Sequence, residues 1–443
     1  MKKPETPPSM EEIQREVLKT ERFSAMLEAA PGLLGEGKYL HWDKLRRYKP
    51  PGDFTHHEWW FALKLGRMSH YKTIPLQDVW GDPFQYLMTD PIPERLHNID
   101  LSAGGKIQMP EQITNPDMRD RYYVGSLIEE AITSSQLEGA VSTRKVAKEM
   151  IRSGRSPRDT SERMILNNFR TMRQIGKLKG KPLTPDLVLE IHRQITDQTL
   201  DDPASAGRFR RTDENVVVDD MYGEVYHNPP PAEQLDQRVA AMCDFANGKT
   251  PDGFVHPVIR SIILHFWLAY DHPFVDGNGR TARALFYWSM LRHGFWLFEF
   301  ISISQMLLKA PAKYGRAFLY TETDDNDLTY FILYHLEVIR RAIEGLHKYL
   351  KRKAQQLQAV ERELRGVSVL NHRQRALVSH ALRHPTHRYT IASHRLSHNV
   401  VYQTARSDLL DLSDRGLVHQ GKIGRTLYFT PVKDLEKVLA GLS

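Results

Sequence analysis

Apolar residues recur every three or four positions from residue 121 to about residue 350, a spacing that predicts a mainly α-helical core. Thr184 stands before Pro185, as an N-cap stands before a proline in the first turn of a helix. Pro257 has the same place before the apolar stretch 258–270. These positions predict helices with well-defined starts.

The helical pattern is interrupted by the stretch Asn215-Val-Val-Val-Asp-Asp-Met-Tyr-Gly-Glu-Val-Tyr-His227. Two short alternating runs flank a turn at residues 220–223, and three prolines follow at residues 229–231, so this stretch predicts a β-hairpin. Because a two-stranded hairpin is marginally stable alone, we expect it to lie over another part of the core.

Residues 1–120 predict an N-terminal extension of helical and irregular segments. Apolar spacing indicates an amphipathic helix over residues 10–30 and another over residues 55–67. The mixed polarity of residues 92–118 predicts loops with a short hairpin. The extension contains no motif with a chemical interpretation, so we expect it to cover the core and hold the helix that follows.

The last part of the chain, residues 366–443, has the element order of a winged helix-turn-helix, and a polar helical connector at residues 351–365 precedes it. The expected elements are helices at 371–383, 390–396 and 400–414, and strands at 417–419 and 426–429 around a turn at 421–424.

Charge gives this last part a candidate partner. The whole chain of 443 residues has 26% charged and 41% apolar residues, which excludes a largely disordered or collagen-like protein. Its formal net charge is +7, and residues 366–430 alone hold nine Lys or Arg against three Asp, a net charge of +6. A local excess of positive charge predicts a polyanion partner.

DNA binding and protein docking both remain open for residues 366–443. Asp408, Asp411 and Asp414 recur along the presumed recognition helix and would repel DNA if they faced it. Gln403 and Arg406 share a different stripe of that helix and suit DNA contacts. We place DNA slightly ahead.

A cytoplasmic protein without a membrane span is expected. No run of 18 apolar residues exists, and the start MKKPETPPSMEE does not resemble a secretory signal. Cys243, the single cysteine, cannot form an internal disulfide and is expected to be a small buried residue on an amphipathic helix.

The stretch from His272 to Arg283, His-Pro-Phe-Val-Asp-Gly-Asn-Gly-Arg-Thr-Ala-Arg, predicts an anion site between two helices. Gly277, Asn278 and Gly279 can adopt positive φ and turn backbone N–H groups inward, where the next helix also points its N-terminus. Arg280 and Arg283 share a helical face and suit phosphate oxygens.

Two other side chains in this stretch have chemistry that suits a phosphate ligand. Asp276 can hold Mg²⁺, which prefers carboxylate and phosphate oxygens. His272, if neutral, can accept a proton from an attacking hydroxyl. Phe274 between them is expected to anchor the loop in the core.

This stretch closely resembles the signature of the Fic (filamentation-induced-by-cAMP) family, H-x-F-x-[D/E]-G-N-G-R-x-x-R, at all eight specified positions. The resemblance implies a Fic-type helical core over residues 121–350 and transfer of AMP from ATP to a hydroxyl side chain of a target protein.

The resemblance also implies roles for the residues that match. His272 would be the base and Asp276 the Mg²⁺ ligand, and Gly277, Asn278 and Gly279 would form the phosphate nest. Arg280 would hold the α- and β-phosphates and Arg283 the γ-phosphate. Thr281 is expected to contribute to the same nucleotide site.

A second stretch, Ser134-Ser-Gln-Leu-Glu138-Gly139, resembles the family's inhibitory motif [S/T]-x-x-x-E-[G/N]. Its spacing puts Ser134 and Glu138 on one face of a helix over residues 121–139, which Gly139 ends. The resemblance implies that Glu138 pairs with Arg283 and occupies the γ-phosphate position. Inhibition would then act in cis.

Two further expectations follow from the family's layout. The hairpin at residues 215–227 would be the flap that pins a target segment, with Val216, Val217 and Val218 as the docking strand. Tyr314 falls where family members line the nucleoside pocket, although this chain has Gly315 where relatives often have a second tyrosine. A nucleotide contact and a buried structural role for Tyr314 are both open.

The sequence therefore predicts a protein adenylyltransferase, autoinhibited by Glu138, with ATP and Mg²⁺ and a target protein that offers a Ser, Thr or Tyr hydroxyl. One alternative is a DNA-binding regulator that uses the core as a nucleotide sensor. Others are removal of AMP or transfer from another donor. A homo-oligomer is a further expectation that one sequence cannot test.

Overall fold

The computed structural model describes residues 2–17, 22–34, 39–104, 116–219, 222–366, 369–423 and 426–441. The chain divides into two compact units, one made of Met1–Gly105 with Ser126–Ile343 and the other of Lys106–Gly125 with Glu344–Ser443. Helices α7 (Pro116–Leu137) and α16 (Thr329–Gly366) have residues in both units. Each unit is described by itself.

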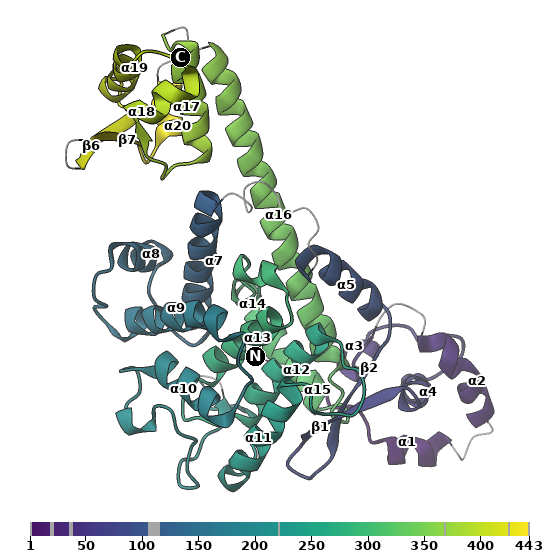
Figure 1. Ribbon diagram of the computed structural model, residues 1–443. Helices are drawn as coiled ribbons and strands as arrows, with labels where there is room; N and C mark the ends of the chain where they lie inside the picture. The colour runs from purple at the N-terminus through teal and green to yellow at the C-terminus, as the bar shows by residue number, and fades with distance from the viewer. Residues whose placement is uncertain are drawn as a thin grey trace. The chain divides into compact units, whose positions relative to one another are not determined.

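The first unit is mainly helical, as the sequence predicts (Figure 1). Its N-terminal elements are α1 (Met10–Val17), α2 (Phe23–Leu34), α3 (Trp42–Leu45), α4 (His56–Met68), β1 (Tyr71–Gln77), β2 (Pro83–Leu87), α5 (Ile92–Ile99) and η1 (Asp100–Gly104). The elements from α8 to the flap are α8 (Arg144–Ser153), α9 (Thr160–Leu178), α10 (Pro185–Thr196), η2 (Pro203–Ser205), β3 (Val218–Asp219) and β4 (Val225–His227). The remaining elements are η3 (Ala232–Gln234), α11 (Leu235–Ala246), α12 (Pro257–Asp271), α13 (Asn278–Arg292), η4 (Trp296–Glu299), α14 (Ser304–Leu308) and α15 (Pro311–Glu322).

Helices α12 and α13 form the centre of this unit. They pack against each other, α11 contacts α12, and α9 and α10 contact α13 (Figure 1). All residues of α12 are buried except Pro257 and Ala269, as expected for a helix that is apolar on every side. Thr184 caps α10 through Leu187 N, and Pro185 and Pro257 stand in the first turns of their helices, as predicted. Cys243 on α11 is buried, also as predicted.

Two N-terminal predictions were wrong. The single helix expected over residues 10–30 is two helices, with Arg22 outside both, and residues 18–21 lie outside the described residues. Loops with a short hairpin were expected over residues 92–118, but the described residues 92–104 form α5 and η1, and an antiparallel hairpin lies earlier, as β1 and β2. Ile74 and Leu76 alternate with exposed residues along β1, whereas Ile92, Leu96 and Ile99 recur at helical spacing in α5. Residues 105–115 lie outside the described residues.

The second unit follows the element order predicted for residues 366–443. It contains α17 (His372–Arg383), β5 (Tyr389–Thr390), α18 (Ile391–His398), α19 (Tyr402–Asp414), β6 (Val418–Ile423), β7 (Thr426–Pro431) and α20 (Leu435–Ala440). The strands form an antiparallel sheet in the order β5–β7–β6, and Val378, Leu409 and Phe429 lie in the core beneath it. The sequence reading missed β5 and α20. Residues 424 and 425 of the predicted wing lie outside the described residues.

In the described parts of the chain, every helix is too short or too polar to cross a membrane. The predicted connector at residues 351–365 is the C-terminal part of α16.

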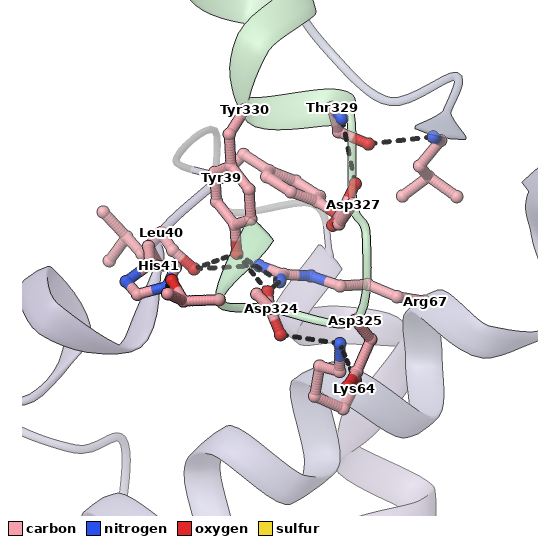
Figure 2. Close-up of polar contacts among 12 residues, drawn as sticks. Tyr39, Leu40, His41, Lys64, Arg67, Asp324, Asp325, Asp327, Thr329 and Tyr330 are labelled. Carbon is pink, nitrogen blue, oxygen red and sulfur yellow. Dashed lines mark hydrogen bonds and ion pairs between the residues drawn. The ribbon is translucent and has the colours of Figure 1, made fainter. Parts of the chain in front are cut away.

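Buried charges join the N-terminal extension to the core (Figure 2). Lys64 and Arg67 on α4 are 2% and 1% exposed, and both face Asp324, which is 2% exposed in the loop before α16. Lys64 Nζ lies 2.7 Å from Asp324 Oδ1, and Arg67 donates to the Tyr330 hydroxyl, which donates in turn to Asp324. Burial alone would raise the pKa of Asp324, but Lys64 and Arg67 hold that pKa below its ordinary value.

Asp327 completes the cluster as a second buried carboxylate. It accepts hydrogen bonds from the hydroxyls of Tyr39 and Tyr71 and from Thr329 N. Burial raises the pKa of Asp327, and the Asp324 charge adds to that shift. The cluster therefore joins residues 39–71 to the loop 324–329. Its charged side chains are buried, and burial of a charge is costly unless the charge is paired or hydrogen-bonded.

Asp324→Asn is expected to destabilise the protein by about 3–5 kcal/mol, because it removes the buried carboxylate that compensates the buried charges of Lys64 and Arg67. The free energy of unfolding from urea titration measures the effect. Asp325→Asn is the matched control: this carboxylate also contacts Lys64 but is 64% exposed, so its loss should cost less than about 1 kcal/mol. Equal losses in the two variants would contradict the buried-cluster interpretation.

Candidate active site

The loop between α12 and α13 carries the predicted anion site. His272 follows α12 in a left-handed conformation, with φ of 44°, and Gly277 precedes α13 with φ of 84°. The Asn278 side chain closes the loop, since its Oδ1 accepts from Phe274 N at 3.0 Å and its Nδ2 donates to Phe274 O at 2.7 Å. Phe274 is fully buried, as expected for the anchor of the loop.

The three residues predicted as a phosphate nest differ in conformation, which corrects the sequence reading. Gly277 has a positive φ, whereas Asn278 and Gly279 already belong to α13. Gly279 instead lies close to another side chain, because a Cβ there would collide with Glu138 Oε1 unless that carboxylate moved. The first N–H groups of α13 lack partners in the helix, so an anion can still bind at its N-terminus.

The geometry of His272 indicates a neutral imidazole ring. Its Nδ1 lies 3.2 Å from Ala269 O, and because a carbonyl only accepts, Nδ1 carries the proton and Nε2 presents the lone pair. Burial lowers the pKa of His272 to about 4, so the ring is neutral at pH 7. Arg210 Nε donates to His272 O at 3.0 Å, which holds the backbone at this bend.

Asp276 and Arg280 lie together at the mouth of the loop. Arg280 is fully buried, and its guanidinium lies 3.0 Å from Asp276 Oδ2. Asp276 Oδ1 accepts from Gly277 N, and the side chain is 51% exposed, so its carboxylate is accessible from solvent. Thr281, predicted as part of the nucleotide site, donates its hydroxyl to Gly277 O at 2.9 Å and supports the loop.

The predicted inhibitory residues meet Arg283. Arg283 is 1% exposed; its Nε donates to Ser134 Oγ at 2.8 Å and its Nη2 to Ser134 O at 3.0 Å. The same Nη2 lies 2.8 Å from Glu138 Oε1. Burial would raise the pKa of Glu138, but Arg283 reverses the shift and holds that pKa below its ordinary value. Gly139, with φ of 90°, follows the end of α7, as the motif predicts.

The predicted flap is a shorter hairpin than expected. Val218 pairs with His227 and Asp219 with Val225, whereas Val216 and Val217 precede the strand. Extending the ladder backward would bring Val216 opposite the first of three prolines, which has no N–H to donate. Residues 220 and 221 of the expected turn lie outside the described residues.

His227 at the end of β4 connects the flap to the end of α12. Its two ring nitrogens lie 2.6 Å from Glu322 Oε2 and 2.7 Å from Tyr270 O, so both donate and the ring is an imidazolium. Burial opposes this charge, but Glu322 raises the pKa of His227 above its ordinary value.

Tyr314 on α15 has a partner inside the protein. Its hydroxyl lies 2.8 Å from His265 Nε2 of α12. Burial raises the pKa of Tyr314 to about 12, which the nearby Arg283 opposes. Both roles left open by the sequence, a nucleotide contact and a structural tyrosine, agree with this geometry.

The sequence analysis did not single out His192 on α10, which supports the loop between α12 and α13 through a hydrogen bond and ring stacking. Its Nδ1 accepts from Gly207 N at 3.0 Å, so Nε2 carries the proton and donates to Asp276 O at 2.9 Å. The ring stacks on Phe274 with centroids 3.7 Å apart. Burial lowers the pKa of His192 to about 4, in agreement with a neutral ring. In the sequence, His192 is a single histidine on the apolar face of a helix, with no sign of this role.

Comparisons with known proteins agree with the geometry. Residues 182–290 match the family model described as Fic/DOC family. The chain is 29% identical over 211 residues to Protein adenylyltransferase Fic of Nematostella vectensis, which is 47% of this chain and 45% of that protein. It is 36% identical over 110 residues to Protein adenylyltransferase fic-1 of Caenorhabditis elegans, which is 25% of this chain and 20% of that protein.

A solved structure is similar in fold over a larger part of the chain. The crystal structure of a Fic family protein from Desulfovibrio desulfuricans G20 superposes with a TM-score of 0.52 at 18% identity, over 79% of this chain and 98% of that one. The chain spans less than half the length of the curated relatives named above. The segment that matches the Fic/DOC family model, residues 182–290, includes α12, α13 and the loop 272–283 between them.

Proposed function

We propose that this chain is a protein adenylyltransferase, which transfers AMP from ATP to a hydroxyl side chain of a target protein and is held back in cis by Glu138. The observation that carries the proposal is the arrangement around α13. His272, the neutral histidine proposed as the base, and two buried arginines, Arg280 and Arg283, surround a helix N-terminus. Glu138 forms an ion pair with Arg283.

The reaction assigned to these groups is an in-line displacement at phosphorus. The target hydroxyl gives its proton to His272 Nε2, and its oxygen forms a bond to the α-phosphorus of ATP. The bond from that phosphorus to the oxygen bridging to the β-phosphate breaks, and pyrophosphate leaves. Arg280, Arg283 and the first N–H groups of α13 hold the phosphate oxygens and balance their charge.

The residues present fit Mg²⁺ that binds together with a nucleotide. Asp276 offers one half-exposed carboxylate, and Mg²⁺ in such sites takes one or two carboxylates and completes its coordination with phosphate oxygens and water. Asp276 is the candidate ligand because it lies beside Arg280 at the N-terminus of α13, where the phosphates would bind. Bound there, Mg²⁺ would neutralise phosphate charge and help to orient the leaving group.

The flap is proposed to align the target. An extended target segment can add a strand to a short hairpin through backbone hydrogen bonds, without requiring a particular sequence. Val216, Val217 and Val218 would receive it, and Val217 is 40% exposed. His227 supports this role, because it ties the hairpin to Tyr270, two residues before the base.

Incorporation from ATP labelled at the α-phosphate or at the γ-phosphate, in the presence of Mg²⁺, tests the proposal. Label from the α-position alone supports transfer of AMP to protein. Label from the γ-position would instead indicate transfer of phosphate and contradict the proposal. Release of AMP from a target labelled beforehand would support the alternative of AMP removal.

A second candidate function, DNA binding by residues 366–443, is favoured by the orientation of the acids on α19. Asp408 is 5% exposed and accepts from Arg373, Asn371 and His394 inside the second unit. Asp411 accepts from Gln374 and Arg415. The repulsion that these two aspartates would cause at a DNA surface is therefore largely removed.

The face left exposed at the start of α19 has the chemistry of a winged-helix recognition surface. Tyr402, Gln403 and Arg406 are exposed there, and Lys422 is exposed on β6. Arg and Gln side chains can contact bases, and Lys suits phosphate.

Arg406→Ala is expected to weaken binding to duplex DNA about tenfold or more at low salt, because it removes one contact from the proposed recognition face. Fluorescence anisotropy with a labelled duplex, repeated over a range of salt concentrations, measures the change. Lys437→Ala removes an exposed charge from α20 in the same unit and should change affinity less than about twofold. Failure of the unaltered chain to bind at low salt would exclude the proposal.

A further inference from the structure

A second polar contact, separate from Glu138, joins the inhibitory helix α7 to the core. Glu130 on α7 is 2% exposed. Its Oε2 accepts from the Tyr287 hydroxyl at 2.9 Å, from Ser302 Oγ at 2.7 Å and from Ser304 N at 3.1 Å. Its Oε1 accepts from Ser304 Oγ. None of the ion pairs among the described residues includes this carboxylate, so neutral donors compensate its burial.

The hydrogen bonds of Glu130 form only when α7 lies in one position relative to α13 and to residues 302–304. A buried carboxylate costs several kcal/mol unless its oxygens are hydrogen-bonded, and here four donors from two separate segments must converge on it. Tyr287 lies on α13, and Ser302 and Ser304 lie at the loop that leads into α14. A small rotation or translation of α7 would break several of these bonds together.

Glu130 and the inhibitory residues lie on the same stripe of α7. Glu130, Ser134 and Glu138 are spaced by four, and Arg283 and Tyr287 are also spaced by four on α13. The two helices therefore meet at two levels: Glu130 with Tyr287, and Ser134 and Glu138 with Arg283. Fixing the first level sets the rotation of α7 that brings Glu138 to the second.

We propose that Glu130 is the positioning residue of the inhibitory contact: its buried hydrogen bonds hold α7 in the rotation at which Glu138 reaches Arg283. This inference rests on the proposed function, in which Glu138 is inhibitory. Glu130 touches neither His272 nor Arg283 in a direct contact, so it acts through Glu138 and has no part in the transfer itself.

The neighbouring Glu129 supplies a matched control. It lies on the same helix but pairs with Arg144 and Lys148 of α8 and with Gln305, and its side chain is 15% exposed. Glu129→Gln therefore makes the same chemical change one residue away without touching the contact to Tyr287. Labelling in this variant should stay within about twofold of the unaltered chain.

Glu130→Gln is expected to raise incorporation of α-phosphate label roughly tenfold, because the amide cannot accept all four hydrogen bonds. The same change in a Glu138→Gly background should alter labelling less than about twofold, since the contact it positions is already gone. Tyr287→Phe removes one of the four donors and keeps the ring, so a smaller rise is expected, and it remains informative if Glu130→Gln folds poorly.

A readout independent of turnover separates positioning from a general structural role. Loss of the Glu138–Arg283 contact should free Arg283 for the γ-phosphate, so Glu130→Gln should acquire part of the preference for ATP over ADP that Glu138→Gly gains. Competition against a fluorescent nucleotide measures this ratio.

Three results would overturn the inference: no rise in labelling with Glu130→Gln, an equal rise with Glu129→Gln, or an equal fall in both backgrounds with no change in nucleotide preference. If Glu138→Gly itself fails to raise labelling, the proposed inhibition fails instead. The two failures are therefore distinguishable.

Discussion

Glu138→Gly is expected to raise transfer of AMP to protein about 10- to 100-fold, because a hydrogen bond to a charged group is worth roughly 1.5–3 kcal/mol and 1.4 kcal/mol is a factor of ten. The side chain of Glu138 is 25% exposed, whereas that of Arg283 is 2% exposed, so the arginine depends on this carboxylate for its charge balance. Without Glu138, a phosphate is the natural anion to take its place. The initial rate of label incorporation from α-labelled ATP measures the rise.

Gln136→Gly is the matched control for this change. It puts a glycine in the last turn of α7, two residues before position 138, but the Gln136 side chain donates to Ser142 O and does not meet Arg283. Any rise caused by loosening of the helix end alone would appear in both variants. Unchanged labelling in Glu138→Gly, with ATP still bound, would contradict inhibition by this residue.

The contact between Glu138 and Arg283 also lies against Gly279, a glycine that the sequence analysis interpreted by its backbone conformation. Gly279 has no left-handed φ, and a Cβ there would occupy the position of the Glu138 carboxylate. A side chain at position 279 would therefore require the Glu138 carboxylate to move. A reading of glycine as a turn residue finds the loop but not this partner, which lies far away in sequence.

The candidate site was predictable from the sequence where its residues are contiguous. The stretch 272–283 contains the proposed base, the carboxylate and both arginines, and helix geometry places them around a single loop. Glu138 and Arg283 are 145 positions apart. Their contact was predicted because Glu138 belongs to a second motif, and the resemblance of that motif implies the pairing.

Supporting residues could not be predicted in the same way. His192 and Glu130 bond to backbone groups and hydroxyls, which occur throughout any sequence and carry no pattern. Lys64 and Asp324 are 260 positions apart, and no sequence motif includes either residue. Such contacts are set by tertiary packing, which local periodicity does not contain.

Secondary structure was likewise predicted where the apolar pattern is long and regular, and missed where that pattern is short or interrupted. Long helices such as α12 were predicted because their apolar pattern repeats over several turns. The hairpin of β1 and β2 was missed, since Pro75 interrupts an already short strand and obscures the alternation of Ile74 and Leu76. At the flap, the prolines that follow β4 limited the ladder to two residue pairs.

Replacing His272 is expected to reduce the transfer rate about 10²- to 10⁴-fold, the usual contribution of a positioned general base. The choice of substitute matters, because this residue has a φ of 44°, in the left-handed region that disfavours alanine and tolerates asparagine. His272→Asn keeps the backbone of the bend and cannot accept a proton at neutral pH. We therefore expect both His272→Ala and His272→Asn to lose transfer while they still bind ATP.

The pH dependence gives the same prediction a second test. Burial lowers the pKa of His272 to about 4, below its ordinary value of 6.5, so the neutral base is fully present above pH 6 and is lost only as pH falls toward 4. The transfer rate of Glu138→Gly should consequently be flat between pH 6 and 8. A rate that rises through pH 6.5 would contradict the lowered pKa of His272. An asparagine variant that retains transfer would mean that His272 is not the base and that the hydroxyl loses its proton to another group.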